Sequence, residues 1–124
     1  MKFYPAASAA AEEDALKTDL QKAHEIGVMK IGSEFLFFRV RLKTYYIPFS
    51  EITRCFRRVR SVPARMCCGR GNMAMESMVI CTEAGEAAEI QMPGERAGKA
   101  ALEELKVKIP HAAFVRPAAE GSEA

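Results

Sequence analysis

The sequence predicts a β-rich α+β fold, a partly open structure of two antiparallel sheets that a C-terminal helix closes at one end. Short apolar segments with strand-like alternation fill residues 35–92. An amphipathic segment over residues 95–108 follows them, and Pro110 ends it. An alanine-rich segment over residues 9–27 precedes the strands and has the composition of a helix. We therefore expect a helix on either side of the strands along the chain.

The N-terminal segment divides into two parts. We expect residues 1–8 to be a flexible leader and residues 9–27 to form a helix. Leu16 and Leu20 lie on one stripe of that helix, and Gly27 suits the position just after its last turn. Because the apolar stripe is narrow, the helix must pack against the rest of the protein to be stable.

The middle of the chain carries the clearest strand patterns. Residues 35–38 form an unbroken apolar run, which is typical of a buried strand. Basic and apolar side chains then alternate over residues 39–43, as in a strand or tight hairpin with one wet face. The pattern continues to Ile47, and Pro48 belongs at the end or edge of a strand. We therefore expect antiparallel strands across residues 35–47.

The strands that follow are less regular. Alternation is imperfect over residues 49–62, which indicates either a β-bulge or a strand with polar side chains on both faces. Gly85 supplies a positive φ for a hairpin turn over residues 83–86. Six strands are expected in all, the last three of them at residues 66–68, 73–82 and 87–92.

The closing helix and the domain limits follow from the C-terminal third of the chain. The helix over residues 95–108 carries an apolar stripe that includes Leu102 and Leu105, which we expect to pack on the strands. Residues 28–115 are expected to form one domain, and a chain of 124 residues is long enough for a single core. Residues 116–124 are expected to be a disordered tail.

Composition predicts a cytoplasmic protein with reduced thiols. The chain contains no run of about 18 apolar residues, and its N-terminus lacks the apolar core of a secretory signal peptide. Structural zinc sites pair cysteines that are separated by about two to four residues, whereas two of the cysteines here are adjacent. We therefore expect neither a disulfide framework nor a metal site from the four cysteines, Cys55, Cys67, Cys68 and Cys81.

No motif in the sequence indicates catalysis. An active site needs a nucleophile, a proton-transfer group and oxyanion donors, and no such set is visible. The segment over residues 69–72 resembles a phosphate-binding loop but lacks its Lys-Ser/Thr ending, so we interpret it as a turn. A pairing of Cys68 with His111 stays open, because a nucleophile and its base need only be close in space. We expect a non-enzyme with no cofactor and no small-molecule substrate.

Charge is distributed unevenly along the chain. Ten basic and two acidic residues lie in residues 30–70, so this segment carries +8. Because the whole chain carries +2, the other residues together carry −6. Such a split can attract an anionic partner or a second copy of the chain, and it can also reflect no more than solvated strand faces.

The basic residues of the strand region form the candidate binding surface. Arg39, Arg41 and Lys43 project from one face of the first strands. A meander would place the next basic segment beside them, because consecutive antiparallel strands are neighbours. The predicted surface consists of Arg39, Arg41, Lys43, Arg54, Arg57, Arg58 and Arg60.

Two runs carry a resemblance to a known fold. Residues 31–38 (IGSEFLFF) and residues 46–52 (YIPFSEI) are similar to segments of uncharacterised bacterial proteins with a pleckstrin-homology-like (PH-like) domain. The resemblance covers roughly residues 30–110. It implies a partly open barrel of two packed sheets with seven strands, plugged by the C-terminal helix. The N-terminal helix is an addition to that plan.

The resemblance implies a binding module and no particular ligand, because a fold does not determine a function. We expect a non-catalytic PH-like interaction module that binds a protein partner or self-associates as a homo-oligomer. The alternative is a binder of an anionic surface, either lipid headgroups or nucleic acid, through the basic strands.

Overall fold

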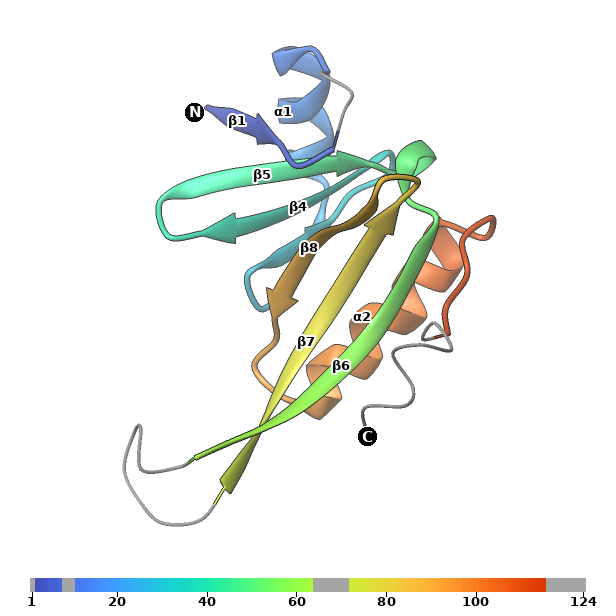
Figure 1. Cartoon of the computed structure of the whole chain (residues 1–124). Coiled ribbons are helices and arrows are strands. Elements are labelled where there is room, and N and C mark those ends of the chain that lie inside the picture. Colours follow the sequence, from blue (N-terminus) through green and yellow to red (C-terminus); the bar gives the residue numbers. More distant parts are fainter. Residues whose placement is uncertain (1, 8–10, 64–71, 116–124) are drawn as a thin grey trace.

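The computed structural model describes residues 2–7, 11–63 and 72–115 and is shown in Figure 1. The described residues form eight strands, two α-helices and one 3-10 turn. In chain order these are β1 (Phe3–Pro5), α1 (Glu13–Gln21), β2 (His24–Ile26), β3 (Met29–Ile31), β4 (Phe35–Val40), β5 (Lys43–Pro48), the 3-10 turn (Phe49–Glu51), β6 (Arg54–Pro63), β7 (Asn72–Thr82), β8 (Gly85–Gln91) and α2 (Glu95–Lys108).

The strands make two sheets. A five-stranded sheet has the order β1-β5-β4-β3-β2, and a three-stranded sheet has the order β6-β7-β8. Strands β2 to β5 form an antiparallel meander, as do β6 to β8. In Figure 1 the β6–β7 pair extends as a long twisted arm away from the five-stranded sheet. No ladder joins the two sheets, so the described strands do not close into a barrel.

The middle of β4, residues 36–38, is buried on both faces, which explains its unbroken apolar run. Leu36 and Phe38 point into the main core between the two sheets and α2. Phe37, which alternates with them, points to the opposite face and packs with Leu16 of α1. Helix α1 therefore covers the outer face of the five-stranded sheet, as Figure 1 shows.

The main core lies where α2 packs against both sheets. Ala101 and Leu105 on α2 are fully buried with Met78 and Ile80 of β7. This confirms that the apolar stripe of the C-terminal helix faces the strands. The helix spans residues 95–108, as its periodicity predicts, and Ile109 caps it through a backbone hydrogen bond to the carbonyl oxygen of Leu105 at 2.7 Å.

A buried carboxylate joins α1 to the start of β4. The carboxylate oxygens of Asp19 accept backbone N–H groups from Ser33, Glu34 and Phe35 at 2.7, 3.1 and 2.9 Å. Asp19 is 2% exposed, and the adjacent Gly32 leaves no room for a Cβ beside it. The carboxylate therefore provides the acceptor for three N–H donors of the partly buried β3–β4 turn.

Several predicted elements match the structure. Residues 35–48 form the antiparallel pair β4 and β5, with Phe35 opposite Pro48. Residues 72–91 form the β7–β8 hairpin around Gly85, whose φ is +115°. The imperfect alternation of β6 reflects charged side chains on both of its faces, since its pairing with β7 runs without a break. The irregularity lies instead in the β7–β8 ladder, where Ile80 pairs with Ala88 and Cys81 with Glu86, so that β8 has one extra residue at this point.

The N-terminal predictions need correction. Residues 3–5 of the expected leader form β1, which pairs in parallel with β5 and makes that sheet mixed. The Phe3 ring lies 5.9 Å from the Phe37 ring, and this tertiary contact has no local sequence signal. The helix spans only Glu13–Gln21 and not residues 9–27, because the chain turns at Lys22 and enters β2.

Gly27 belongs to a strand hairpin and not to a helix end. It has a φ of +63° in the turn between β2 and β3, where Ile26 lies opposite Met29. With β1, these two short strands raise the number of described strands to eight, compared with the six expected. Strands of three residues are too short to show alternation, so the pattern could not reveal them.

Three expectations fall outside the described residues. They are the strand at residues 66–68, the tail at residues 116–124 and the turn at residues 69–72, of which only Asn72 is described, as the first residue of β7.

Candidate functional site

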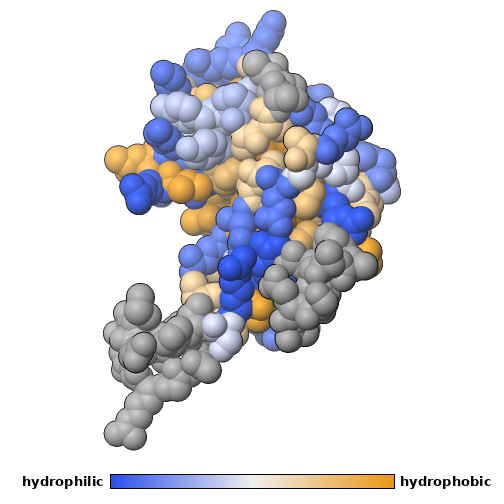
Figure 2. Space-filling view, in the orientation of Figure 1, coloured by the Kyte–Doolittle hydropathy of each residue, from blue (hydrophilic) through white to orange (hydrophobic). Residues whose placement is uncertain are grey.

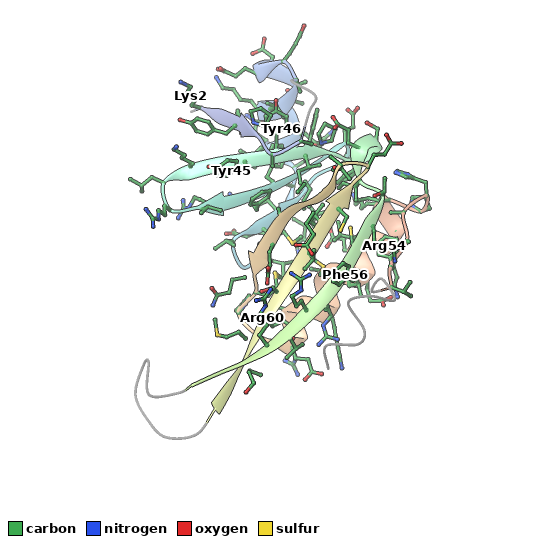
Figure 3. The ribbon with its side chains drawn as sticks, viewed as in Figure 1. Lys2, Tyr45, Tyr46, Arg54, Phe56 and Arg60 are labelled. Carbon is green, nitrogen blue, oxygen red and sulfur yellow. The ribbon has the colours of Figure 1, made fainter. Side chains whose placement is uncertain are left out.

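The structure divides the seven predicted binding residues into two groups. Arg54, Arg57, Arg58 and Arg60 lie on β6, which pairs with β7 in the three-stranded sheet. The other three lie at the β4–β5 hairpin of the five-stranded sheet. The expected meander from β5 to β6 is therefore wrong, because the 3-10 turn after β5 carries the chain into the other sheet. Figure 3 shows Arg54 and Arg60 on β6, away from Lys2 and Tyr45.

The arginines at the centre of β6 pair with acids of their own chain. Arg57 makes two hydrogen bonds to the carboxylate of Glu76, which raises the pKa of its guanidinium. Arg58 is 8% exposed and bridges Glu86 at 2.5 Å and Glu89 at 3.0 Å. These contacts stabilise the three-stranded sheet across its strands and neutralise its basic charge.

The remaining two arginines of β6 are also engaged. The guanidinium of Arg60 lies 3.3 Å from the carboxylate of Glu89, and that of Arg54 donates to the backbone oxygen of Val115 at 2.6 Å. The guanidinium of Arg58 lies 5.5 Å from the centre of the Phe56 ring. The arginines of β6 thus serve the internal structure of the sheet, although Arg60 is also exposed to solvent.

A cluster of outward-facing cations lies at the end of the β4–β5 hairpin. We define the hairpin tip as Arg39, Val40, Arg41, Leu42 and Lys43, all of which are exposed. Leu42 is 98% exposed, and Val40 is 49% exposed. Figure 2 shows this end of the hairpin as an orange patch bordered by blue. Among the described residues, no carboxylate forms an ion pair with any of its three cations.

The backbone of the hairpin tip holds an uncommon conformation. Val40 lies opposite Lys43, so Arg41 and Leu42 form a two-residue turn. Arg41 has a φ of 58°, in the left-handed region that residues other than glycine rarely adopt. Two ammonium groups, those of Lys43 and Lys2, lie 5.1 and 5.8 Å from the centre of the Tyr4 ring. The tip therefore combines local strain, positive charge and an exposed leucine.

A groove runs beside the hairpin tip. Its volume is about 540 Å³, and Val28 and Val40 line it opposite Ile90 and Met92 at the end of β8. Figure 2 shows a hollow below the hairpin, between the five-stranded sheet and the β6–β7 arm. The tip thus stands free on this side and is accessible to a partner.

Sequence reasoning found the cations of the tip and missed its apolar residues. The alternation over residues 39–43 predicts that the apolar side chains face the core and the cations face water. In the structure both kinds are exposed, because the hairpin extends beyond the end of the core. The sequence left a strand and a tight hairpin open for residues 39–43, and the structure shows the hairpin. Its turn at Arg41-Leu42 has none of the Gly, Asn, Asp or Pro residues that usually mark a turn, so its position could not be predicted.

The chemistry of the remaining candidates is limited. Cys67 and Cys68 lie outside the described residues. The nucleophile–base pair of Cys68 with His111 therefore falls outside them as well. The ring of His111 forms a hydrogen bond with the backbone oxygen of Ile52 at 3.1 Å. In the described parts of the chain, no three His, Cys, Asp or Glu side chains are grouped so that they could hold a metal ion.

The buried thiol of Cys55 should make the free energy of unfolding depend on pH. Burial raises its pKa from 9.0 to about 12, with a smaller contribution from Cys81. Between these values the unfolded thiol loses its proton while the folded thiol keeps it, so stability falls as the pH rises. We expect the free energy of unfolding to drop by about 1.4 kcal/mol more between pH 8 and pH 10 for the wild type than for Cys55→Val.

Urea denaturation at the two pH values measures this difference. Cys81→Ser serves as the control, because the side chain of Cys81 is only half-buried and this variant keeps Cys55. An equal pH dependence in the wild type and Cys55→Val would contradict a buried neutral thiol at this position.

The comparisons with known proteins identify a family and nothing beyond it. Neither described helix is long and apolar enough to span a membrane. No curated protein matches the chain, and no solved structure matches it either. A family model does match, under the description "Domain of unknown function (DUF6709)", and it covers residues 1–116. The chain therefore belongs to the DUF6709 family.

Proposed function

We propose that this protein is a non-catalytic interaction module with a PH-like fold, and that it binds a protein partner or another copy of itself through the hairpin tip. One observation carries the proposal: Leu42 is 98% exposed in an ordered turn with a cation on each side. A fully exposed leucine contributes nothing to the stability of its own chain, so its burial by a partner is favourable.

The arrangement of strands supports the PH-like part of the proposal. Four consecutive antiparallel strands, β2 to β5, are followed by three more, β6 to β8, and then by α2. This is the seven-strand plan with a C-terminal helix that the resemblance implies. Strand β1 and helix α1 are additions on the outer face of the first sheet.

The conformation of Arg41 supports a functional role for the tip. A left-handed residue other than glycine costs on the order of 1–2 kcal/mol, and such strain gathers at binding sites. Here the strained turn presents Leu42 outward and spreads three cations around it. An apolar anchor within a charged rim is the usual composition of a protein-binding surface. The partner is therefore expected to offer an apolar pocket with acidic residues around it.

A photo-crosslinking amino acid at position 42 tests the proposal. We expect benzoylphenylalanine in place of Leu42 to form a covalent adduct with one defined protein, or with a second copy, in the native cells. The substitution leaves the fold intact because this side chain contacts nothing in the core. Mass spectrometry of the adduct identifies the partner.

The control places the same amino acid at Val107, which is 78% exposed on α2. A specific contact gives an adduct at position 42 and none of the same mass at position 107. Equal labelling at both positions, or no protein adduct at position 42, would remove the tip as a protein-binding site.

The alternative function is binding to an anionic lipid surface. An exposed leucine that is flanked by cations can insert among lipid headgroups, where each cation contributes about 1 kcal/mol. Under this alternative the protein sediments with phosphatidylserine vesicles and not with phosphatidylcholine vesicles. Nucleic acid is less favoured, because the four arginines of β6 are engaged within the chain, which leaves the small hairpin tip as the part of the predicted basic surface that has no internal ion pair among the described residues.

A further inference from the structure

We propose that the partner of the hairpin tip is a second copy of this chain, which receives the tip in an acidic groove at the opposite end of β5. This inference rests on the proposed function and names the partner of the same surface. The contact joins two different surfaces, so it is head to tail and leaves one tip and one groove open in every dimer.

The receiving groove lies beside the β7–β8 turn and has a volume of about 700 Å³. Alanines form much of its wall, among them Ala6, Ala84 and Ala87. Three carboxylates line it, those of Glu51, Glu83 and Glu86, and no basic residue is among its lining residues. Glu86 pairs with Arg58, and Glu51 also has an interaction within its own chain, so part of the negative charge is offset.

The two surfaces are complementary in size and in charge. The short alanine side chains leave space for the branched side chain of Leu42, which is the most exposed large apolar residue of the described chain. The three cations of the tip then face the carboxylates along the groove. A symmetric contact of tip with tip would instead bring three cations against three cations, and such like-charge contacts are unfavourable.

The geometry of β5 makes this contact intermolecular. The tip ends at Lys43, where β5 begins, and the groove is lined by Ser50, just after β5 ends at Pro48. Six residues of extended strand separate the two surfaces by about 20 Å. The strand is held rigidly in its sheet by β1 and β4, so the tip cannot reach the groove of its own molecule.

Two variants, each with one surface destroyed, test the inference. The tip variant carries Arg39→Glu with Leu42→Asp, and the groove variant carries Glu83→Lys with Ala84→Arg. All four positions are exposed, so both variants are expected to fold. Each alone should be monomeric by light scattering. A 1:1 mixture should form a species of twice the 13.7 kDa monomer mass and nothing larger, because the intact tip of one variant meets the intact groove of the other.

The wild type and a matched control complete the experiment. The wild type should form larger species at low salt, and its association should weaken at least about tenfold between 0.1 and 1 M salt as screening grows. The control, Lys106→Glu with Val107→Asp, makes the same change of charge and polarity on the exposed face of α2 and should associate like the wild type.

Each contrary result has a defined meaning. A wild type that is monomeric at every salt concentration overturns the inference, and so does a tip or groove variant that still self-associates. Sedimentation of a monomeric wild type with phosphatidylserine vesicles overturns it in favour of the lipid alternative. A crosslink from position 42 to a different protein overturns it while the proposed function stands. A monomeric wild type that also gives no adduct at position 42 overturns both this inference and the proposed function.

Discussion

Leu105→Asp is expected to unfold the protein. Leu105 is fully buried on α2, at the centre of the core that both sheets share. The substitution removes about 2–5 kcal/mol of packing and places an unpaired carboxylate in an apolar site, which costs several kcal/mol more. The sum is comparable with the total stability of a typical domain, about 5–15 kcal/mol. Circular dichroism should show no cooperative thermal transition.

Two further variants keep this prediction measurable. Leu105→Ala should fold and lose about 2–5 kcal/mol in urea denaturation, because it creates a cavity without a charge. Val107→Asp introduces the same carboxylate on the exposed face of α2 and should cost less than about 1 kcal/mol. A Leu105→Asp protein that melts like the wild type would show that α2 does not hold the sheets together.

Asp19→Ala is expected to lower the free energy of unfolding by about 3–5 kcal/mol. The substitution leaves three backbone N–H groups, those of Ser33, Glu34 and Phe35, without their acceptor in a partly buried turn. It also detaches α1 from β4, so hydrogen exchange at these three amides should accelerate more than in the core strands. Urea denaturation and amide exchange by NMR measure the two effects.

The matched control is Asp14→Ala on the same helix. Asp14 is exposed in the first turn of α1, and its loss should cost about 0.5 kcal/mol through the helix dipole. The loss of stability in Asp19→Asn should lie between those of the two alanine variants. The amide oxygen of Asn still accepts hydrogen bonds, whereas its NH₂ group is a donor and cannot accept from the turn amides. Equal stability of Asp19→Ala and Asp14→Ala would mean that the buried carboxylate contributes nothing specific.

Sequence reasoning was least able to find Asp19. Asp19 lies three residues after Leu16 and interrupts the apolar stripe of α1. An acid on this otherwise apolar face was the signal that could have indicated its burial. That signal does not say which donors the acid meets, since Ser33 and Phe35 lie fourteen and sixteen residues away. The same holds for Glu76, which is 6% exposed and pairs with Arg57 across the β6–β7 ladder.

The candidate site shows a similar division. The sequence alone predicted a basic surface that contains Arg39, Arg41 and Lys43, because their alternation with apolar residues is a local pattern. It also grouped the β6 arginines with them, since it could not show that acids of β7 and β8 lie within reach. The exposure of Leu42 was likewise invisible, because it depends on how far the hairpin extends beyond the core.

Local patterns were sufficient to predict the β-rich fold class, antiparallel strands over residues 35–47, the β7–β8 hairpin and the bounds of α2. These elements follow from period-two and helical patterns over long segments, which record burial on one face. The folded chain was needed to reveal the three short strands, the parallel pairing of β1, the separation of β6 from β5 and the ion-pair partners of the β6 arginines. Such features depend on contacts between residues far apart in the chain, and side-chain periodicity within one segment carries no record of them.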